Sequence, residues 1–186
     1  AHSGNAQTDS ETAPSLTRFE FSEPHMGVTF RIILYAADEI TANKASQAAF
    51  DRVEELNNLL SDYDPQSELS KLSETAGIEQ SVPVSEERWS VLNKAQQVSV
   101  LSDGAFDVTV GSAVKLWRRA RRAQQLPDPK LLAEALKSIG YEQLKFDEQT
   151  RGVKLTMPHA RLDLGGIAKG YAADEAIRVL KQHGVS

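Results

Sequence analysis

Hydrophobic side chains occupy every second position of residues 28–35 (VTFRIILY), and this two-residue period predicts a β-strand. The intervening positions include Ile33 and Tyr35, so we expect both faces of the strand to be at least partly covered. Another strand is predicted to begin at Phe19–Phe21. The start of the folded region is therefore expected to be β-structure.

The hydrophobic period lengthens to three and four residues between positions 39 and 60, which is typical of an amphipathic helix. The repeating apolar positions are Ala45, Ala49, Val53, Leu56 and Leu60. We expect this helix to pack on a sheet and to end before the turn residues SDYDP at 61–65. Two further helices are predicted, one from the N-cap Ser85 to the closing Gly104 and one within Pro127–Ile139.

Shorter strands are predicted in the second half of the chain. FDVTV at 106–110 has the composition of a short strand, and Leu144–Phe146 with Val153–Met157 predicts a hairpin. Arg161–Leu164 predicts a final strand that runs into a glycine pair and a last helix. Strand pairs mixed with helices in this order predict an α+β fold, arranged as a layered α/β sandwich.

Composition narrows the class of protein. The 186 residues contain no cysteine, which excludes disulfide scaffolds, zinc-cysteine sites, iron-sulfur clusters and thiol nucleophiles. A net charge of -5 argues against a nucleic-acid partner, and no apolar run approaches the roughly eighteen residues of a membrane span. Residues 1–17 are mostly small and polar, so we interpret them as a flexible leader and 18–186 as the folded portion.

The segment LDLGGIAKG at 162–170 carries the strongest local signal for a ligand. Glycines at 165 and 166 permit close backbone approach, and the start of the following helix favours an anion. Lys169, in the first turn, can add a full positive charge to the same phosphate. The alternative interpretation is a tight strand-to-helix corner with a solvated lysine.

Other candidate residues leave alternatives open. Asp163 can bind a ribose hydroxyl, a ring N–H or a metal, or it can form a hydrogen bond within the corner. Tyr63 can stack on a flat ring or cover the end of the long helix. The basic segment KLWRRARR at 115–122 can face an anionic partner, although a solvated helix face is favoured by the acidic composition. The histidines have no metal-ligand spacing.

Four segments carry a resemblance when they are taken in order. They are Met26–Phe30 (MGVTF), Leu60–Leu69 (LSDYDPQSEL), Gly104–Gly111 (GAFDVTVG) followed by Trp117, and Leu162–Asp174 (LDLGGIAKGYAAD). Their ordered set resembles the FAD:protein FMN transferase family, also called the ApbE-like or flavin transferase family. The resemblance covers almost all of the chain after the leader. It implies an ApbE-like fold of which this chain is the first of two similar halves.

The resemblance also implies a flavin site. The positions that match FAD-contacting residues of the family are Met26, Tyr63, Ala105, Phe106, Asp107, Asp163 and Lys169. The backbone carbonyl of Gly166 matches a family ligand of Mg²⁺. The catalytic Asp and Thr side chains that complete the metal site in the family are expected in a carboxyl-terminal half that does not follow Ser186.

The family's enzymes cleave FAD with Mg²⁺ and attach FMN through a phosphoester to a threonine of a target flavoprotein, typically in a membrane redox complex. The resemblance therefore implies a transferase that is exported to the periplasm, in some members with a lipid anchor. Because the metal shell is incomplete, we expect this chain alone to bind FAD weakly and to transfer little FMN. Two alternatives are a FAD-binding protein without transfer activity and a structural or interaction domain.

Overall fold

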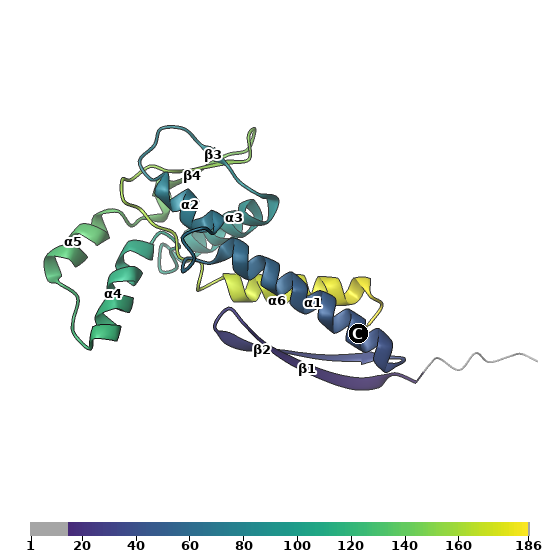
Figure 1. Cartoon of the computed structure of the whole chain (residues 1–186). Coiled ribbons are helices and arrows are strands. Elements are labelled where there is room, and N and C mark those ends of the chain that lie inside the picture. The colour runs from purple at the N-terminus through teal and green to yellow at the C-terminus, as the bar shows by residue number, and fades with distance from the viewer. Residues whose placement is uncertain (1–14, 186) are drawn as a thin grey trace, which may run out of the picture.

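The computed structural model describes residues 15–185 (Figure 1). The first part of the chain contains β1 (Thr17–His25), β2 (Val28–Ala36), α1 (Glu39–Leu60), α2 (Glu68–Glu74), β3 (Val82–Pro83) and α3 (Glu86–Leu101). The second part contains α4 (Gly111–Ala123), α5 (Pro129–Lys137), a short 3-10 turn (Tyr141–Gln143), β4 (Leu144–Asp147), β5 (Gly152–Leu155) and α6 (Ala168–Gln182). Most of the predicted leader lies outside the described residues, but Thr17, assigned to it, already opens β1.

The first two strands form an antiparallel hairpin. Phe21 pairs with Ile32, and both strands turn their inner faces toward α1. The two turn residues, Met26 and Gly27, have positive φ angles of 49° and 73°, the backbone geometry of a tight two-residue hairpin loop. A methionine in this region is uncommon because its Cβ crowds the backbone.

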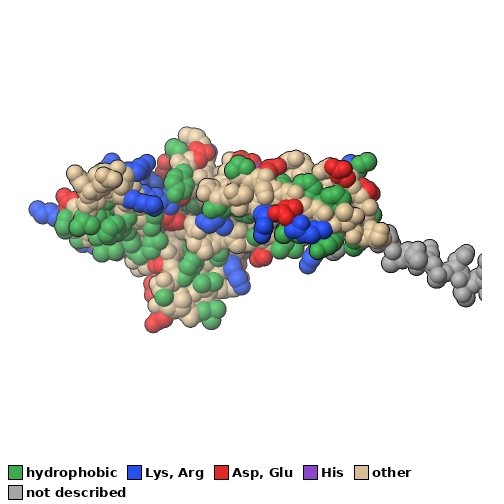
Figure 2. Space-filling model, turned by 90° about the horizontal axis from the view of Figure 1, so that it is seen from below, with side chains coloured by type: hydrophobic (Ala, Val, Ile, Leu, Met, Phe, Trp, Pro, Cys, Tyr) green, Lys and Arg blue, Asp and Glu red, His purple; other side chains and the backbone are tan. Residues whose placement is uncertain are grey.

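The outer face of the hairpin contradicts the expectation that both faces are covered. Ile33 and Tyr35 remain exposed there, since no described element packs on that side. Figure 2, which views the molecule from the hairpin side, shows hydrophobic side chains interspersed with charged ones. Arg18 and Glu20 pair across the strands with Tyr35 and Ile33, and they form a salt bridge with each other at 2.7 Å.

Helices α1 and α6 lie side by side over the hairpin (Figure 1). Each helix buries three alanines, and small side chains of this kind let neighbouring helix backbones approach closely. The alanines are Ala42, Ala45 and Ala49 of α1 with Ala168, Ala172 and Ala176 of α6. The predicted bounds of α1 are confirmed, and Asp38 caps it by accepting a hydrogen bond from the Thr41 amide at 2.7 Å.

A three-stranded sheet with the order β3-β5-β4 forms a second layer. The predicted hairpin is confirmed, with Leu144 opposite Leu155. Trp89 of α3 meets Phe146 of β4 edge to face, with ring centroids 5.3 Å apart. The α+β class is confirmed, and the helix predicted after Ser85 and the one predicted before Gly140 are present as α3 and α5.

Two predicted strands are wrong. Residues 106–110 and 161–164 are irregular, and a single parallel bridge joins Val110 to Arg161. The reason in the first segment is Asp107, whose Oδ1 accepts from the Thr109 amide at 2.7 Å and folds the chain into a turn. In the second segment, Asp163 accepts in the same way from the Gly165 amide at 2.8 Å. Both side-chain hydrogen bonds compete with the backbone hydrogen bonds that would pair an extended strand with its neighbour.

Candidate functional site

A pocket of about 530 Å³ lies where the hairpin tip, the end of α1 and the start of α6 meet. Its volume is in the range of small-molecule sites, roughly 300–1,000 Å³. The residues that matter most below are Met26, Tyr63, Arg118, Leu164, Gly165 and Lys169. We call this cavity the flavin pocket, because three residues that the resemblance assigned to a flavin line it.

Met26, Tyr63 and Lys169 are far apart in the sequence, and the fold brings them to this one pocket. The β1–β2 turn projects Met26, and the loop after α1 presents Tyr63 with 76% of its surface exposed. An exposed aromatic face is suited to stacking on a flat ring. The rim of the pocket thus combines an apolar side chain with an aromatic one.

The glycine corner supplies the polar end of the pocket. Lys169 lies in the first turn of α6, and its Nζ donates to the Gly165 carbonyl at 3.1 Å. The start of α6 has no side-chain cap, although the Ile167 and Ala168 amides donate to the Leu164 carbonyl at 2.9 and 2.8 Å, and the positive end of the helix dipole faces this corner. Together the lysine and the helix terminus favour a bound anion such as a pyrophosphate.

Asp163 does not line the flavin pocket directly, and both of its oxygens are engaged. Oδ1 accepts from the Gly165 amide at 2.8 Å, which is the corner hydrogen bond considered as the alternative role. Oδ2 accepts from Arg118 at 2.7 Å. The side chain is only 9% exposed, so this pairing fixes it beside the corner.

Arg118 lines the flavin pocket, and the sequence interpretation did not assign it there. Its guanidinium forms ion pairs with Asp62 and Asp163 and lies 4.2 Å from the centre of the Tyr63 ring. Burial opposes its charge, but the two carboxylates outweigh that effect and raise the pKa of Arg118 above its usual value. The solvated-face interpretation of the basic segment is therefore wrong for Arg118, which is 28% exposed.

A positional signal for Arg118 was present in the sequence. Lys115, Arg118 and Arg122 follow each other at spacings of three and four, which places them on one face of a helix. Arg119 and Arg121 occupy other positions and are exposed. The spacing could therefore have predicted that Lys115, Arg118 and Arg122 share one face of a helix. It could not have predicted that Asp62 and Asp163 form ion pairs with Arg118.

The residues predicted at 105–107 lie behind the corner and do not line the flavin pocket. Phe106 lies so close to Gly166 that a Cβ added there would meet its ring at 3.0 Å. Asp107 accepts from both the amide and the hydroxyl of Thr109, each at 2.7 Å. Ala105 is exposed in the adjoining turn. In this structure, Phe106 packs against Gly166, and Asp107 fixes the turn that leads to Thr109.

The donors for a metal ion are few near Gly166. Within residues 15–185 no cluster of three or more histidine, aspartate or glutamate side chains could hold a cation. Asp163, the nearest predicted carboxylate, is already committed to Arg118 and to the Gly165 amide. Since Mg²⁺ needs several oxygen ligands, the described residues do not by themselves fit a Mg²⁺ site.

None of the helices within residues 15–185 is long and apolar enough to cross a membrane.

Comparison with known proteins places these observations in a family. The sequence profile of the ApbE family matches residues 26–186. A FAD:protein FMN transferase of Klebsiella pneumoniae is 30% identical over 90% of this chain and 51% of its own length. One from Vibrio cholerae is 32% identical over 88% of this chain and 49% of its own length.

Solved structures agree with the sequence relatives. The crystal structure of the ApbE protein from Thermotoga maritima superimposes with a TM-score of 0.80 at 30% identity, over 90% of this chain and 53% of that one. The flavin transferase ApbE from Vibrio cholerae gives a TM-score of 0.79 at 26% identity, over 92% of this chain and 55% of that one. This chain spans about half the length of the relatives it matches.

Proposed function

The chain belongs to the ApbE family, and from this premise we propose that it is part of an FAD:protein FMN transferase that binds FAD in the flavin pocket. The observation that carries the proposal is the convergence of Met26, Tyr63 and Lys169 on one pocket beside the glycine corner. Each of these residues lies in a motif that resembles a FAD-contacting segment of the family.

FAD has two flat ring systems joined by a pyrophosphate, and the pocket offers a matching surface for part of it. Tyr63 supplies a face for stacking, and Met26 supplies apolar contact from the hairpin tip. Lys169 and the start of α6 lie where they can offset pyrophosphate charge. Arg118 acts through Asp163 and Tyr63, so we assign it a positioning role.

The proposed reaction exchanges one phosphorus–oxygen bond for another. The threonine hydroxyl of the acceptor attacks the phosphorus on the FMN side of FAD, and the phosphoanhydride bond breaks. FMN becomes joined to threonine by a phosphoester, AMP leaves with the bridging oxygen, and the hydroxyl proton passes to solvent or a base. Lys169 would stabilise the charge that develops on the phosphate oxygens.

We also propose that transfer requires Mg²⁺ and that the 186-residue chain transfers little FMN by itself. Mg²⁺ would neutralise phosphate charge when bound. The Gly166 carbonyl remains the proposed ligand from this chain, and the described residues supply no full shell around it.

The acceptor and the location of the protein belong to the same proposal. We propose that the acceptor is a flavoprotein of a membrane redox complex. We also propose that the transferase is exported to the periplasm, with or without a lipid anchor. These expectations come from the family resemblance. Expression with the native amino-terminal sequence, followed by cell fractionation, tests the location, and recovery in the cytoplasm alone would contradict it.

Transfer is tested by incubating the chain with FAD, Mg²⁺ and an acceptor that bears the threonine, and by reading flavin fluorescence in a denaturing gel. Little labelling is expected from the chain alone, and strong labelling would contradict the incomplete metal shell. A second candidate, FAD binding without transfer, is favoured because Met26, Tyr63 and Lys169 line one pocket while residues 15–185 hold no cluster of metal-ligating side chains. Metal-dependent release of AMP would exclude it.

A further inference from the structure

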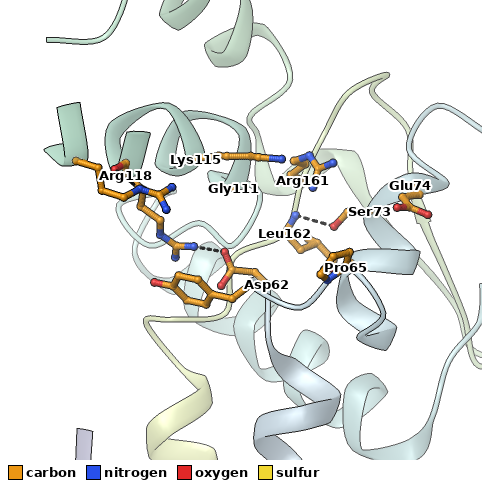
Figure 3. Close-up of a pocket in the computed structure, with 12 residues that line it drawn as sticks. Asp62, Pro65, Ser73, Glu74, Gly111, Lys115, Arg118, Arg161 and Leu162 are labelled. Carbon is orange, nitrogen blue, oxygen red and sulfur yellow. Dashed lines mark hydrogen bonds and ion pairs between the residues drawn. The ribbon is translucent and has the colours of Figure 1, made fainter. Parts of the chain in front are cut away.

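A second, smaller pocket of about 280 Å³ shares Asp62, Tyr63 and Arg118 with the flavin pocket (Figure 3). Its remaining walls come from Pro65 in the loop after α1, from α2, from one face of α4 and from the segment before α6. The volume is too small for a dinucleotide, which fills a site of several hundred cubic ångströms, but it is sufficient for a group the size of phosphate. We call this cavity the basic pocket.

Four cationic side chains line the basic pocket: Lys115, Arg118, Arg122 and Arg161. Three of them belong to the single face of α4 described above, and Arg161 comes from the segment that pairs with Val110. The hydrogen bond from the Gly111 amide to the Arg161 carbonyl, at 3.0 Å, holds that segment against the start of α4. Figure 3 shows the Lys115 side chain extending toward Arg161 across this junction.

The pairing of these cations is incomplete. Arg118 is neutralised by Asp62 and Asp163, and Nε of Arg122 donates to the Arg118 carbonyl at 3.3 Å. Within residues 15–185, the side chains of Lys115 and Arg161 form no hydrogen bond and no ion pair. Two like charges that face the same cavity repel each other, and an anion bound between them offsets that repulsion.

The carboxylates do not remove the excess positive charge. Asp62 is taken up by Arg118, which leaves Glu74 as the one other acidic residue in the lining. Lys115, Arg122 and Arg161 therefore outnumber Glu74 by two charges, and the excess falls to one when Asp163, the second carboxylate on Arg118, is included. This excess of positive charge favours a phosphate anion, for which lysine and arginine together supply a point charge and a planar fork of donors.

We propose that the basic pocket binds a phosphomonoester or inorganic phosphate, held between Lys115 and Arg161 with Arg122 at its edge. The site is separate from the glycine corner, so the proposal does not depend on FAD binding in the flavin pocket. Free phosphate and the phosphate of a nucleoside monophosphate share the required charge and geometry. The two ligands are distinguished by whether the nucleoside of a nucleoside monophosphate raises the affinity above that of free phosphate.

Calorimetric titration at constant ionic strength tests the site, with inorganic phosphate, AMP and adenosine as separate ligands. Wild-type protein is expected to bind phosphate, and Lys115→Gln and Arg161→Gln should each weaken binding by about tenfold. Arg121→Gln is the matched control, because it removes one charge from the same helix at an exposed position outside the basic pocket. It should change the affinity by less than about twofold.

Binding of AMP more tightly than phosphate would identify a nucleotide as the ligand, and equal binding would identify phosphate itself. Either result supports the site if Lys115→Gln and Arg161→Gln weaken phosphate binding and Arg121→Gln does not. The proposal is overturned if phosphate gives no heat at millimolar concentration, if Arg121→Gln weakens binding as much as Lys115→Gln, or if adenosine binds as well as AMP. Circular dichroism of each variant checks that the fold is retained.

Discussion

Arg118 donates a hydrogen bond to Oδ2 of Asp163 at 2.7 Å, and this contact joins α4 to the residue that precedes the glycine corner. The same guanidinium also pairs with Asp62 and covers the Tyr63 ring. One side chain therefore connects the loop after α1, the helix α4 and the corner before α6. This connection explains how residues from three motifs keep fixed positions around the flavin pocket.

Replacing Arg118 tests that connection. Arg118→Met keeps an apolar stem but leaves Asp62 and Asp163 without their cation, so the free energy of unfolding should fall by about 2 kcal/mol. FAD affinity should fall about tenfold as Tyr63 loses its support. Chemical denaturation and FAD titration measure the two effects. Arg119→Met, at an exposed position of α4, is the control and should change neither.

Arg118→Lys separates charge from geometry at the same position. Lysine keeps the positive charge but lacks the planar fork that reaches two carboxylates at once. We expect it to recover less than half of the lost affinity on a free-energy scale. Full recovery of both FAD affinity and stability would show that a point charge suffices and would contradict the positioning role.

Tyr63 is expected to act through its ring. Tyr63→Ala should weaken FAD binding by about tenfold, because stacking of an aromatic side chain on a base contributes roughly 1–3 kcal/mol. Tyr63→Phe should retain most of the affinity. Quenching of flavin fluorescence during titration measures both. The control is Tyr35→Ala on the open face of the hairpin, and an equal loss in that variant would argue against a specific role for Tyr63.

Met26 offers a way to separate function from stability. Its φ of 49° favours a residue such as asparagine, so Met26→Asn should relieve backbone strain while it removes apolar contact. We expect the free energy of unfolding to change by less than about 1 kcal/mol, because the two effects oppose each other. FAD affinity should nevertheless fall. An affinity unchanged from wild type would remove Met26 from the flavin pocket.

His25 makes the attachment of the hairpin sensitive to pH. It contacts Glu54 of α1 at 2.9 Å and Glu23 at 3.1 Å, and its ring stacks on Phe50. Burial lowers its pKa, but the two carboxylates outweigh burial, so the folded-state pKa of His25 is raised. The stabilisation is fully present below the unfolded-state pKa, about 6.5, and is lost as pH rises through the higher folded-state value.

Stability should therefore decrease as pH rises above about 6.5, and His25→Gln should remove most of that decrease. Urea denaturation at a series of pH values measures the slope. His183→Gln serves as the control because His183 lies at the exposed end of α6. A slope that persists in His25→Gln and disappears in His183→Gln would place the pH-sensitive group elsewhere.

Much of the fold is readable from the sequence where a single periodic pattern decides the structure. The bounds of α1 follow from its three- and four-residue spacing, and the pairing of Leu144 with Leu155 lies within the predicted hairpin. The two wrong strands both contain an aspartate that bonds to the backbone two residues ahead. Such local bonds are decided by a side-chain conformation that composition alone does not reveal.

The sequence predicted those residues of the candidate site that lie within recognisable motifs. The motifs identified Met26, Tyr63 and Lys169, which the structure brings to one pocket. Arg118 was missed because its partners are remote, with Asp163 lying 45 positions away in the chain. A charge run by itself does not show which cation is buried against carboxylates, since that depends on how α4 packs on the corner.

The most direct test of the central claim is FAD affinity measured on Lys169→Gln and on Lys181→Gln, which lies at the other end of the same helix. Removing charge beside the glycine corner should weaken binding about tenfold, because the pyrophosphate loses its cationic partner. Removing charge at position 181 should leave affinity within about twofold of wild type. Equal affinities for wild type, Lys169→Gln and Lys181→Gln would contradict FAD binding at this corner.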